Sequence, residues 1–408
     1  MLTNEERRVP IYSTVSIPTR SNEVTPETPL ESLNLNWTEK DLPERMRTKH
    51  VHRLHPYLGK YIPQLVEVFL RKYFKKGQTI LDPFCGSGTT LVQANELGIN
   101  SIGYDISAFN ILLSRAKTAK YNVTQARREI LDIIDKVKVA TQIDFKQQKL
   151  WIECTKGPYL SSEDNEYLKT WFAPKALEEL LTYRYFIESE NYQYKDLLRI
   201  ILCRSARSAR LTTHFDLDFP KKTVTKPYHC HKHNRICQPT QDAFKFLSRY
   251  SLDTIKRISE FNSIRTNAKV ELHHEDCRYA NFPPVHGVIT SPPYVGLIDY
   301  HEQHVYAYHL LGLDDKRENE IGPATNGKSR NAQENYQKDI TEVFRRIIST
   351  MHPDGRLIVV ANDSSNLYGE ISNSLDIEVE NIIQRHVNRR TGRRSTEFYE
   401  SIFIWRKI

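Results

Sequence analysis

The sequence contains no hydrophobic run long enough to cross a membrane. Hydrophobic residues make up 39% and charged residues 26% of its 408 residues, and no apolar stretch approaches the ~20 residues that a membrane helix needs. No apolar segment follows the first residues, so we expect no secretory signal peptide. Six cysteines in so long a chain are too few for a disulfide framework. We therefore expect an intracellular, cytoplasmic protein.

Positive charge is scarce outside one part of the chain. Overall, 58 Lys and Arg stand against 50 Asp and Glu, a net charge of +8. Residues 199–270 hold 15 basic and 5 acidic residues, a net of +10, so the rest of the chain is slightly acidic. Concentrated positive charge suits a phosphate backbone, although an isolated basic run is more often a solvated helix face. The residues expected to contact phosphates here are Arg204, Arg207, Arg210, Lys221 and Lys222.

Helix and strand patterns alternate in two separated parts of the chain. PQLVEVFLRKYF and TTLVQANELG have helical spacing, while QTILDPF and INSIGYDIS are short β runs. The β pattern returns after about residue 266 and ends in FYESIFIWRK. This alternation predicts an α/β fold with a doubly wound, mostly parallel sheet and one antiparallel strand near the C-terminus. We divide the chain into an N-terminal arm, partly mobile and ordered from about Trp37 (1–45), an α/β domain (46–120 and 266–408) and a helical, basic insertion (121–265).

The strongest local signal is the loop Asp82-Pro83-Phe84-Cys85-Gly86-Ser87-Gly88-Thr89-Thr90, between a β run and a helix. Ligands of α/β sheets bind at the carboxyl ends of strands, where glycines allow close backbone approach. The loop lacks both the full G-x-G-x-x-G spacing and a G-K-[ST] ending, which argues against pyrophosphate binding. The Asp82 carboxylate would instead face a cationic amine or sulfonium group favourably. Ser87 or Thr89 can cap the following helix.

Two further strand ends carry candidate site residues. Asp105 ends the β run after the glycine loop, near the spacing at which an acidic residue binds the ribose hydroxyls of an adenosine ligand; a helix cap is the alternative. Thr290-Ser291-Pro292-Pro293-Tyr294 follows the apolar run HGVI. Its prolines cannot extend a central strand and hold a stiff loop. Ser291 and the Pro292 carbonyl could accept the amino hydrogens of a flat ring on which Tyr294 stacks; a structural turn is the alternative.

Together, DPFCGSGTT, IGYDIS and TSPPY resemble the S-adenosylmethionine-dependent DNA amino-methyltransferases of restriction–modification systems. SPPY resembles the cytosine-N4 group in particular, since adenine-N6 enzymes usually have DPPY or NPPY. The loop from Asp82 to Gly88 matches motif I, residues 55–63 (HPYLGKYIP) resemble motif X, and Asp276 falls where motif III places an acid near the cofactor adenine. The resemblance covers about residues 46–120 and 266–408.

The resemblance implies a set of functional residues and partners. Catalysis is expected of Ser291, Pro292, Pro293 and Tyr294. Binding of S-adenosylmethionine is expected of His55, Lys60, Asp82, Pro83, Phe84, Gly86, Gly88, Thr89, Asp105, Asp276 and Cys277. The helical insertion resembles the target-recognition region of the family, which implies duplex DNA with a specific target sequence as substrate. A cognate restriction endonuclease acting separately is the implied partner, in a bacterium or archaeon.

The expected reaction is transfer of a methyl group to the exocyclic N4 of a flipped-out cytosine. Adenine-N6 methylation on the same scaffold is the alternative, and a non-catalytic DNA-binding subunit is a remote one. RNA or protein-glutamine methylation shares Pro-Pro-Tyr loops, but the basic insertion favours long nucleic acid. The sequence contains no Pro-Cys pair, so the nucleophile of a cytosine-C5 enzyme is missing.

Three weaker groups of residues remain. Cys230-x2-His233-x3-Cys237, with His214, His229 and His231 nearby, offers donors that zinc uses, but the sequence singles out no fourth ligand. We therefore predict no metal and expect a DNA-facing polar loop or buried thiols. The segment YHEQHVYAYHLLG (300–312) is interpreted as an amphipathic helix rather than part of the target pocket. The run 385–395 is predicted to contact phosphates through Arg390, Arg393 and Arg394.

Overall fold

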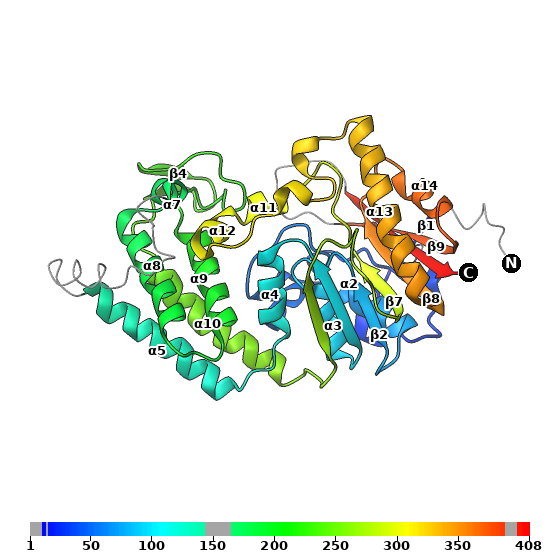
Figure 1. Cartoon of the computed structure of the whole chain (residues 1–408), viewed down its shortest axis with the longest axis horizontal. Helices are drawn as coiled ribbons and strands as arrows, with labels where there is room; N and C mark the ends of the chain where they lie inside the picture. The colour runs from blue at the N-terminus through cyan, green and yellow to red at the C-terminus, as the bar shows by residue number, and fades with distance from the viewer. Residues whose placement is uncertain (1–9, 14, 143–164, 388–397) are drawn as a thin grey trace.

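The computed structural model describes residues 10–13, 15–142, 165–387 and 398–408 (Figure 1). Within these ranges one sheet has eight strands in the order β1-β9-β10-β8-β7-β2-β3-β6. Its strands are β1 (Ile11–Tyr12), β2 (Thr79–Asp82), β3 (Asn100–Asp105), β6 (Val270–His274), β7 (Val285–Thr290), β8 (Met351–Ala361), β9 (Ile377–His386) and β10 (Tyr399–Lys407). Strands β6, β3, β2, β7 and β8 are parallel, and β10 is antiparallel to β8 and β9. The predicted fold class and the antiparallel C-terminal strand are both confirmed.

Helices cover both faces of this sheet. Neighbouring residues of a strand point to opposite sides, and both sides are apolar in the central strands, so each face needs a layer of helices. The helices of the α/β part are α2 (Pro63–Tyr73), α3 (Thr89–Glu96), α4 (Ala108–Thr118), α13 (Arg330–Thr350) and α14 (Leu367–Asn373). Ile80 of β2 and Ile289 of β7 pack in one hydrophobic cluster with α2, whereas Leu81 and Val288 pack in another with α13. Strands buried on both faces read as continuous apolar runs, which is the pattern seen in the sequence.

The N-terminal segment packs more closely than the sequence predicts. Val24, Leu33 and Leu35 are at most 5% exposed and belong to the cluster beneath α2. Two 3-10 turns, Ser21–Glu23 and Leu30–Ser32, lie in this segment. Order therefore begins well before Trp37, which corrects that expectation, because a few leucines are enough to fix an otherwise polar segment on the sheet.

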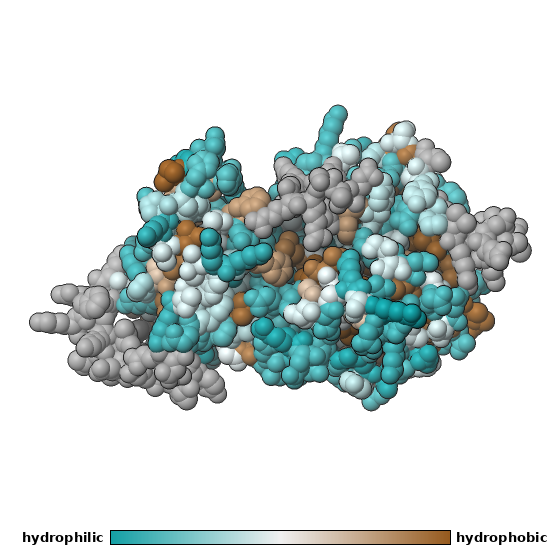
Figure 2. Space-filling model, turned by 90° about the horizontal axis from the view of Figure 1, so that it is seen from above, coloured by the Kyte–Doolittle hydropathy of each residue, from teal (hydrophilic) through white to brown (hydrophobic). Residues whose placement is uncertain are grey.

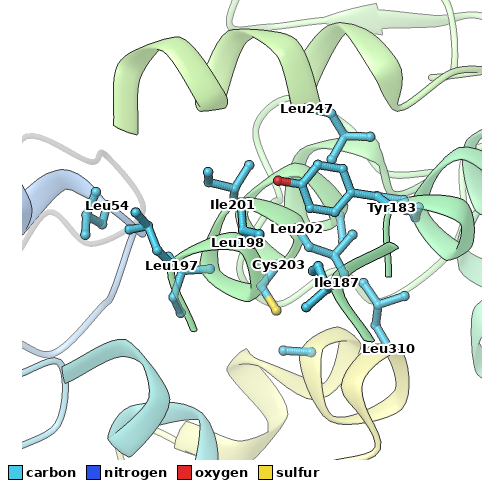
Figure 3. Packing of buried hydrophobic residues seen from close by; sticks show 14 of the residues in the cluster. Leu54, Tyr183, Ile187, Leu197, Leu198, Ile201, Leu202, Cys203, Leu247 and Leu310 are labelled. Carbon is cyan, nitrogen blue, oxygen red and sulfur yellow. The ribbon is translucent and has the colours of Figure 1, made fainter. Parts of the chain in front are cut away.

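A helical unit lies beside the sheet (Figure 1). It consists of α5 (Val123–Gln142), α7 (Glu166–Trp171), α8 (Pro174–Ser189), α9 (Lys195–Ala209), α10 (Phe244–Asn262) and the hairpin of β4 (Tyr228–Cys230) and β5 (Arg235–Cys237). Glu179 of α8 accepts the backbone N–H groups of Ala243 and Phe244 and so ties α10 to α8. Side chains of α9 fill the centre of the unit (Figure 3).

The chain returns to this helical unit after the sheet strand β7. Three short helices, α1 (Glu44–Arg47), α11 (Tyr300–Gln303) and α12 (Val305–Leu311), complete the chain's α-helices in the described ranges. Leu310 of α12 packs among the α8 and α9 side chains (Figure 3). The segment after Tyr294 therefore joins the two parts, so the hydrophobic core of the helical unit is not confined to residues 121–265.

The described helices include none that is long and apolar enough to cross a membrane. Seen from above, the surface is mostly hydrophilic, and apolar residues gather near the middle of the molecule, between the helical unit and the sheet (Figure 2).

Candidate active site

A pocket lies where the loops after β2, β3 and β7 meet. In parallel α/β sheets this edge is the usual ligand-binding edge. Ten of the residues predicted for the site line it: Lys60, Pro83, Phe84, Gly86, Thr89, Asp105, Asp276, Cys277, Ser291 and Pro293. Tertiary structure thus gathers segments that are more than 200 residues apart in the sequence.

The glycine loop and Asp105 are joined by a backbone hydrogen bond. The N–H of Gly86 donates to Asp105 Oδ2 at 2.8 Å, and Gly86 has a φ of +49°. Asp105 Oδ1 accepts from the Ser107 N–H at 2.8 Å and from Asn110 Nδ2 at 3.0 Å. Burial nevertheless raises the pKa of Asp105 to about 6. The loop after β2 and the acidic end of β3 are therefore one rigid unit with a carboxyl group at the pocket wall.

Asp82 lies elsewhere than the sequence suggests. It is 1% exposed and does not line the pocket. Its carboxylate accepts from Thr90 Oγ1 at 2.5 Å, Thr290 Oγ1 at 2.6 Å, the Phe84 N–H at 3.2 Å and the Tyr61 hydroxyl at 3.2 Å. Burial raises the pKa of Asp82 to about 6, against the effect of these donors. The expectation that this carboxylate faces a cationic ligand is wrong, because protein donors surround it.

The Ser291–Tyr294 loop separates two hollows. Ser291 and Pro293 line the large pocket, whereas Tyr294 lines a second, much smaller one together with Leu297, Asn362 and residues near them. Tyr294 is 8% exposed, and its hydroxyl donates to Glu400 Oε1 at 3.3 Å. Glu400 in turn pairs with the buried Arg385 at 2.9 Å. The stiff loop after β7 is thus anchored to β10 and β9.

Two further expected cofactor residues, His55 and Gly88, do not line the pocket, and a third, Asp276, lines it but is paired within the protein. His55 is fully buried and contacts the Pro56 carbonyl and the Tyr306 hydroxyl, and Gly88 faces Ser114 rather than the pocket. Asp276 lines the pocket, but its carboxylate is paired with Arg278 at 2.6 Å. These three positions support the architecture of the site, which corrects the expectation of direct contact for His55 and Gly88.

Sequence reasoning missed other residues of the pocket wall. Tyr57, Asn110, Tyr300 and Glu320 also line the pocket. Tyr57 lies inside the HPYLGKYIP segment, so the motif could have indicated it. Asn110, five residues after Asp105 on α4, could have been found from helical spacing, since one turn brings it back to the strand end. Tyr300 begins the segment 300–312, for which lining of the pocket was the alternative to an amphipathic helix, whereas no signal in the sequence points to Glu320.

Three polar side-chain atoms of residues that line the pocket lack a hydrogen-bond partner in the part of the chain that the structure describes. Ser87 Oγ, Thr89 Oγ1 and Asn110 Oδ1 are buried without a hydrogen-bond partner among the described residues, and all three residues line the pocket. Buried polar groups are ordinarily paired, so three such atoms around one hollow indicate a polar ligand. Burial lowers the pKa of Lys60, also at the wall, to about 8. This wall fits a ligand with hydroxyl, carboxylate and amino groups.

Three of the six arginines predicted to contact phosphates, Arg204, Arg207 and Arg210, are buried or partly buried. Arg204 pairs with Asp253 at 2.7 Å and stacks on Tyr250. Arg207 pairs with Asp218 at 2.6 Å, and Arg210, 1% exposed, donates to the Leu217 carbonyl. Their guanidinium groups hold the helical unit together, which corrects that part of the prediction. The physical reason is that pairing and burial draw these guanidinium groups into the protein, away from a phosphate backbone.

The two lysines predicted to contact phosphates are on the surface, whereas the three arginines predicted from the 385–395 run are not described. Lys221 and Lys222 are exposed in the loop after α9. Arg390, Arg393 and Arg394 lie outside the described residues. Arg385, at the start of the same basic run, is buried and paired with Glu400.

The sheet order, the reversed β10 and a glycine-loop pocket with an acidic strand end define the S-adenosylmethionine-dependent methyltransferases. S-adenosylmethionine is accordingly the methyl donor. A family model described as DNA methylase matches residues 22–115. Among solved structures, TrmN from Thermus thermophilus is 11% identical with a TM-score of 0.32, over 86% of this chain and 50% of that one, a likeness too weak to support a conclusion.

Two curated relatives are far more informative about the family. The chain is 36% identical over 430 residues to Type II methyltransferase M.MjaII of Methanocaldococcus jannaschii, covering 89% of this chain and 81% of that protein. It is 26% identical to Type II methyltransferase M.BsoBI of Geobacillus stearothermophilus, covering 68% of this chain and 56% of that protein. The chain belongs to the type II DNA methyltransferases, in the family that contains the adenine-N6 and cytosine-N4 enzymes, and its substrate is DNA.

Proposed function

We propose that this enzyme methylates the exocyclic N4 of cytosine at a specific site in duplex DNA. The observation that carries the proposal is the Ser291–Tyr294 loop at the end of β7, with one hollow on each side. A serine at the first position supports cytosine, as the sequence resemblance implies. Adenine-N6 is the second candidate, because the same loop could hold the amino group of either base.

The proposed role of the loop is to make a poor nucleophile reactive. The lone pair of a cytosine amino group is delocalised into the ring. Ser291 Oγ and the Pro292 carbonyl would accept the two amino hydrogens and so localise the lone pair on nitrogen. Fixed polar groups that point at a developing charge typically stabilise the transition state by a few kcal/mol each. The nitrogen lone pair would form the new N–C bond as the C–S bond of the donor breaks and S-adenosylhomocysteine leaves. The nitrogen would then lose one proton to solvent.

Residues of the large pocket would hold the methyl donor. S-adenosylmethionine supplies a methyl group that its sulfonium makes electrophilic. The Asp105 carboxyl group would accept the ribose hydroxyls, and Ser87, Thr89 and Asn110 offer the polar atoms that have no partner. Holding the methyl group of the donor next to the target amine would account for a large part of the rate enhancement, because the reacting atoms no longer have to find each other.

The target base must leave the duplex to reach this loop, at a cost of a few kcal/mol for unstacking. We propose that Tyr294 recovers part of this free energy by stacking on the base, and that residues 121–265 read the target sequence while residues 46–120 and 266–408 carry the reaction. Lys221 and Lys222 would contact phosphates. A role as the modification enzyme of a restriction–modification system, with a separate endonuclease, completes the proposal.

The base assignment can be tested directly. Duplex DNA is incubated with the enzyme and isotopically labelled S-adenosylmethionine, and its nucleosides are analysed by mass spectrometry. We expect the label in N4-methylcytosine. Label in N6-methyladenine would overturn the base assignment and leave the family unchanged, whereas cofactor binding without any label in DNA would contradict the whole proposal.

The raised pKa of Asp105 gives a prediction for cofactor binding. Protonation below pH about 6 removes the charge that attracts the ribose hydroxyls, so affinity should fall as the pH drops and level off above the pKa. One proton taken up limits the slope to about tenfold per pH unit. Calorimetry of cofactor binding between about pH 5 and 8 measures it.

A variant of Asp105 distinguishes the effect of its titration on cofactor binding from the effect of Asp82. Asp82 titrates in the same range, so the pH series is repeated with Asp105→Asn. We expect weaker binding and a flat profile for this variant. A profile that keeps its slope would show that Asp105 is not the group responsible.

A further inference from the structure

Four side chains with metal-binding atoms meet at the small hairpin of the helical unit. Cys230 ends β4, His233 lies in the turn, Cys237 ends β5, and His214 comes from the loop after α9. Cys230 Sγ lies 3.7 Å from His214 Nδ1 and 3.6 Å from His233 Nδ1, and Cys237 Sγ lies 3.6 Å from His233 Nδ1. The four ligand atoms all lie within 4.8 Å of one another.

These separations are those of a tetrahedral zinc site. Bond lengths of about 2.3 Å to sulfur and 2.0–2.1 Å to nitrogen, at tetrahedral angles, place neighbouring sulfur and nitrogen ligands about 3.6 Å apart. Two cysteines and two histidines form one of the common structural ligand sets, and a pair of thiolates balances the charge of the ion. All four positions would be filled by protein, which leaves no open position for a substrate.

The hairpin also needs a stabilising element that its side chains do not supply. No residue from 212 to 242, a stretch that the structure describes throughout, belongs to a hydrophobic cluster. The two strands have three residues each, and an isolated two-stranded hairpin is marginal in water. Cys230 and Cys237 are 2% and 7% exposed, whereas Ile236 is 62% exposed. The hairpin thus buries its cysteines and exposes its isoleucine.

His214 is the ligand that the sequence did not single out. It precedes Cys230 by 16 positions, a spacing that no short pattern marks. Its backbone N–H donates to the Tyr228 hydroxyl at 3.1 Å, which fixes the loop against β4. Tertiary structure therefore completes the incomplete Cys-x2-His-x3-Cys pattern.

We propose that His214, Cys230, His233 and Cys237 bind one structural Zn²⁺ ion. The ion holds the loop of residues 211–243, with its exposed Lys221, Lys222 and Lys226, in a fixed shape on the helical unit. This replaces the expectation of no metal. Its role is in the fold of the loop, separate from methyl transfer.

Metal analysis of the untagged, full-length protein purified without chelators tests the site. We expect a zinc-to-chain ratio near one in wild type and at least about fivefold less zinc in Cys230→Ser and Cys237→Ser, since ligand loss removes most of the affinity of a structural site. His231→Ala is the matched control, because this histidine lies in the same hairpin and is exposed; it should keep its zinc. Cobalt substitution should give the visible bands of tetrahedral thiolate coordination in wild type and in His231→Ala.

Cofactor binding by each variant shows whether the α/β part has folded, so loss of zinc can be told from general unfolding. A wild-type protein that holds no zinc even after zinc is added would overturn the proposal. So would full zinc in a folded Cys230→Ser variant, or a disulfide between the two cysteines in freshly purified protein.

Discussion

Ser291→Ala is expected to lower the rate of methyl transfer about 10²–10³-fold, the range found when one fixed polar group of a reaction site is removed. Ser291 lines the large pocket at the end of β7, and its hydroxyl would accept a hydrogen of the target amine only while that nitrogen becomes tetrahedral. Cofactor affinity should therefore change little. Single-turnover methylation with saturating cofactor measures the rate, and calorimetry measures the affinity.

Ser349→Ala is the control for this experiment. It removes the same hydroxyl from an exposed residue near the end of α13 that lines neither pocket, and we expect near wild-type rates. If Ser291→Ala weakened cofactor binding and left the single-turnover rate unchanged, the loop would belong to the cofactor site and the proposed role of Ser291 would be wrong.

Asp82→Ala is expected to have the largest effect on stability. Its carboxylate is surrounded by donors from three segments: Tyr61 before α2, Thr90 at the start of α3 and Thr290 at the end of β7. Leaving buried donors unpaired costs about 1–3 kcal/mol each, although hydroxyls can turn to other acceptors. We therefore expect the free energy of unfolding to fall by about 3 kcal/mol, measured by chemical denaturation near neutral pH.

Asp82→Asn makes the comparison sharper. It keeps the size of the side chain and one acceptor oxygen and carries no buried charge, so the loss should be much smaller than for alanine. The sequence-based interpretation, a carboxylate facing the cofactor, gives the opposite pattern. If Asp82→Ala were as stable as wild type but lost cofactor affinity selectively, that interpretation would be right and the structural role would be wrong.

The sequence located the site well where local chemistry is restrictive. Gly86 adopts a positive φ, and Pro292 and Pro293 cannot continue β7, so these loops could be recognised without a fold. Asp105 could be placed because it ends a clear β run. The direction of a side chain was beyond sequence reasoning, as Asp82 and His55 show. Both have the residue types of a ligand contact, yet both are turned into the protein by neighbours that are distant in the sequence.

Local positive charge was the least reliable predictor of the residues that contact DNA phosphates. Arg204, Arg207 and Arg210 carry much of the local positive charge, but acidic partners or backbone carbonyls occupy all three. A count of charges along the chain cannot show such pairing, because a partner such as Asp253 lies 49 positions away from Arg204.

By itself the sequence determined the α/β class, the antiparallel last strand, the cofactor and the family, because periodicity and short motifs are local properties of the chain. Tertiary structure alone decided which of the predicted residues face the pocket, how the Ser291–Tyr294 loop comes to separate two hollows, and that His214 joins Cys230, His233 and Cys237. The physical reason is the same in each case. These arrangements depend on contacts between segments far apart in the sequence, and such contacts are fixed only when the sheet and the helical unit pack around their buried cores.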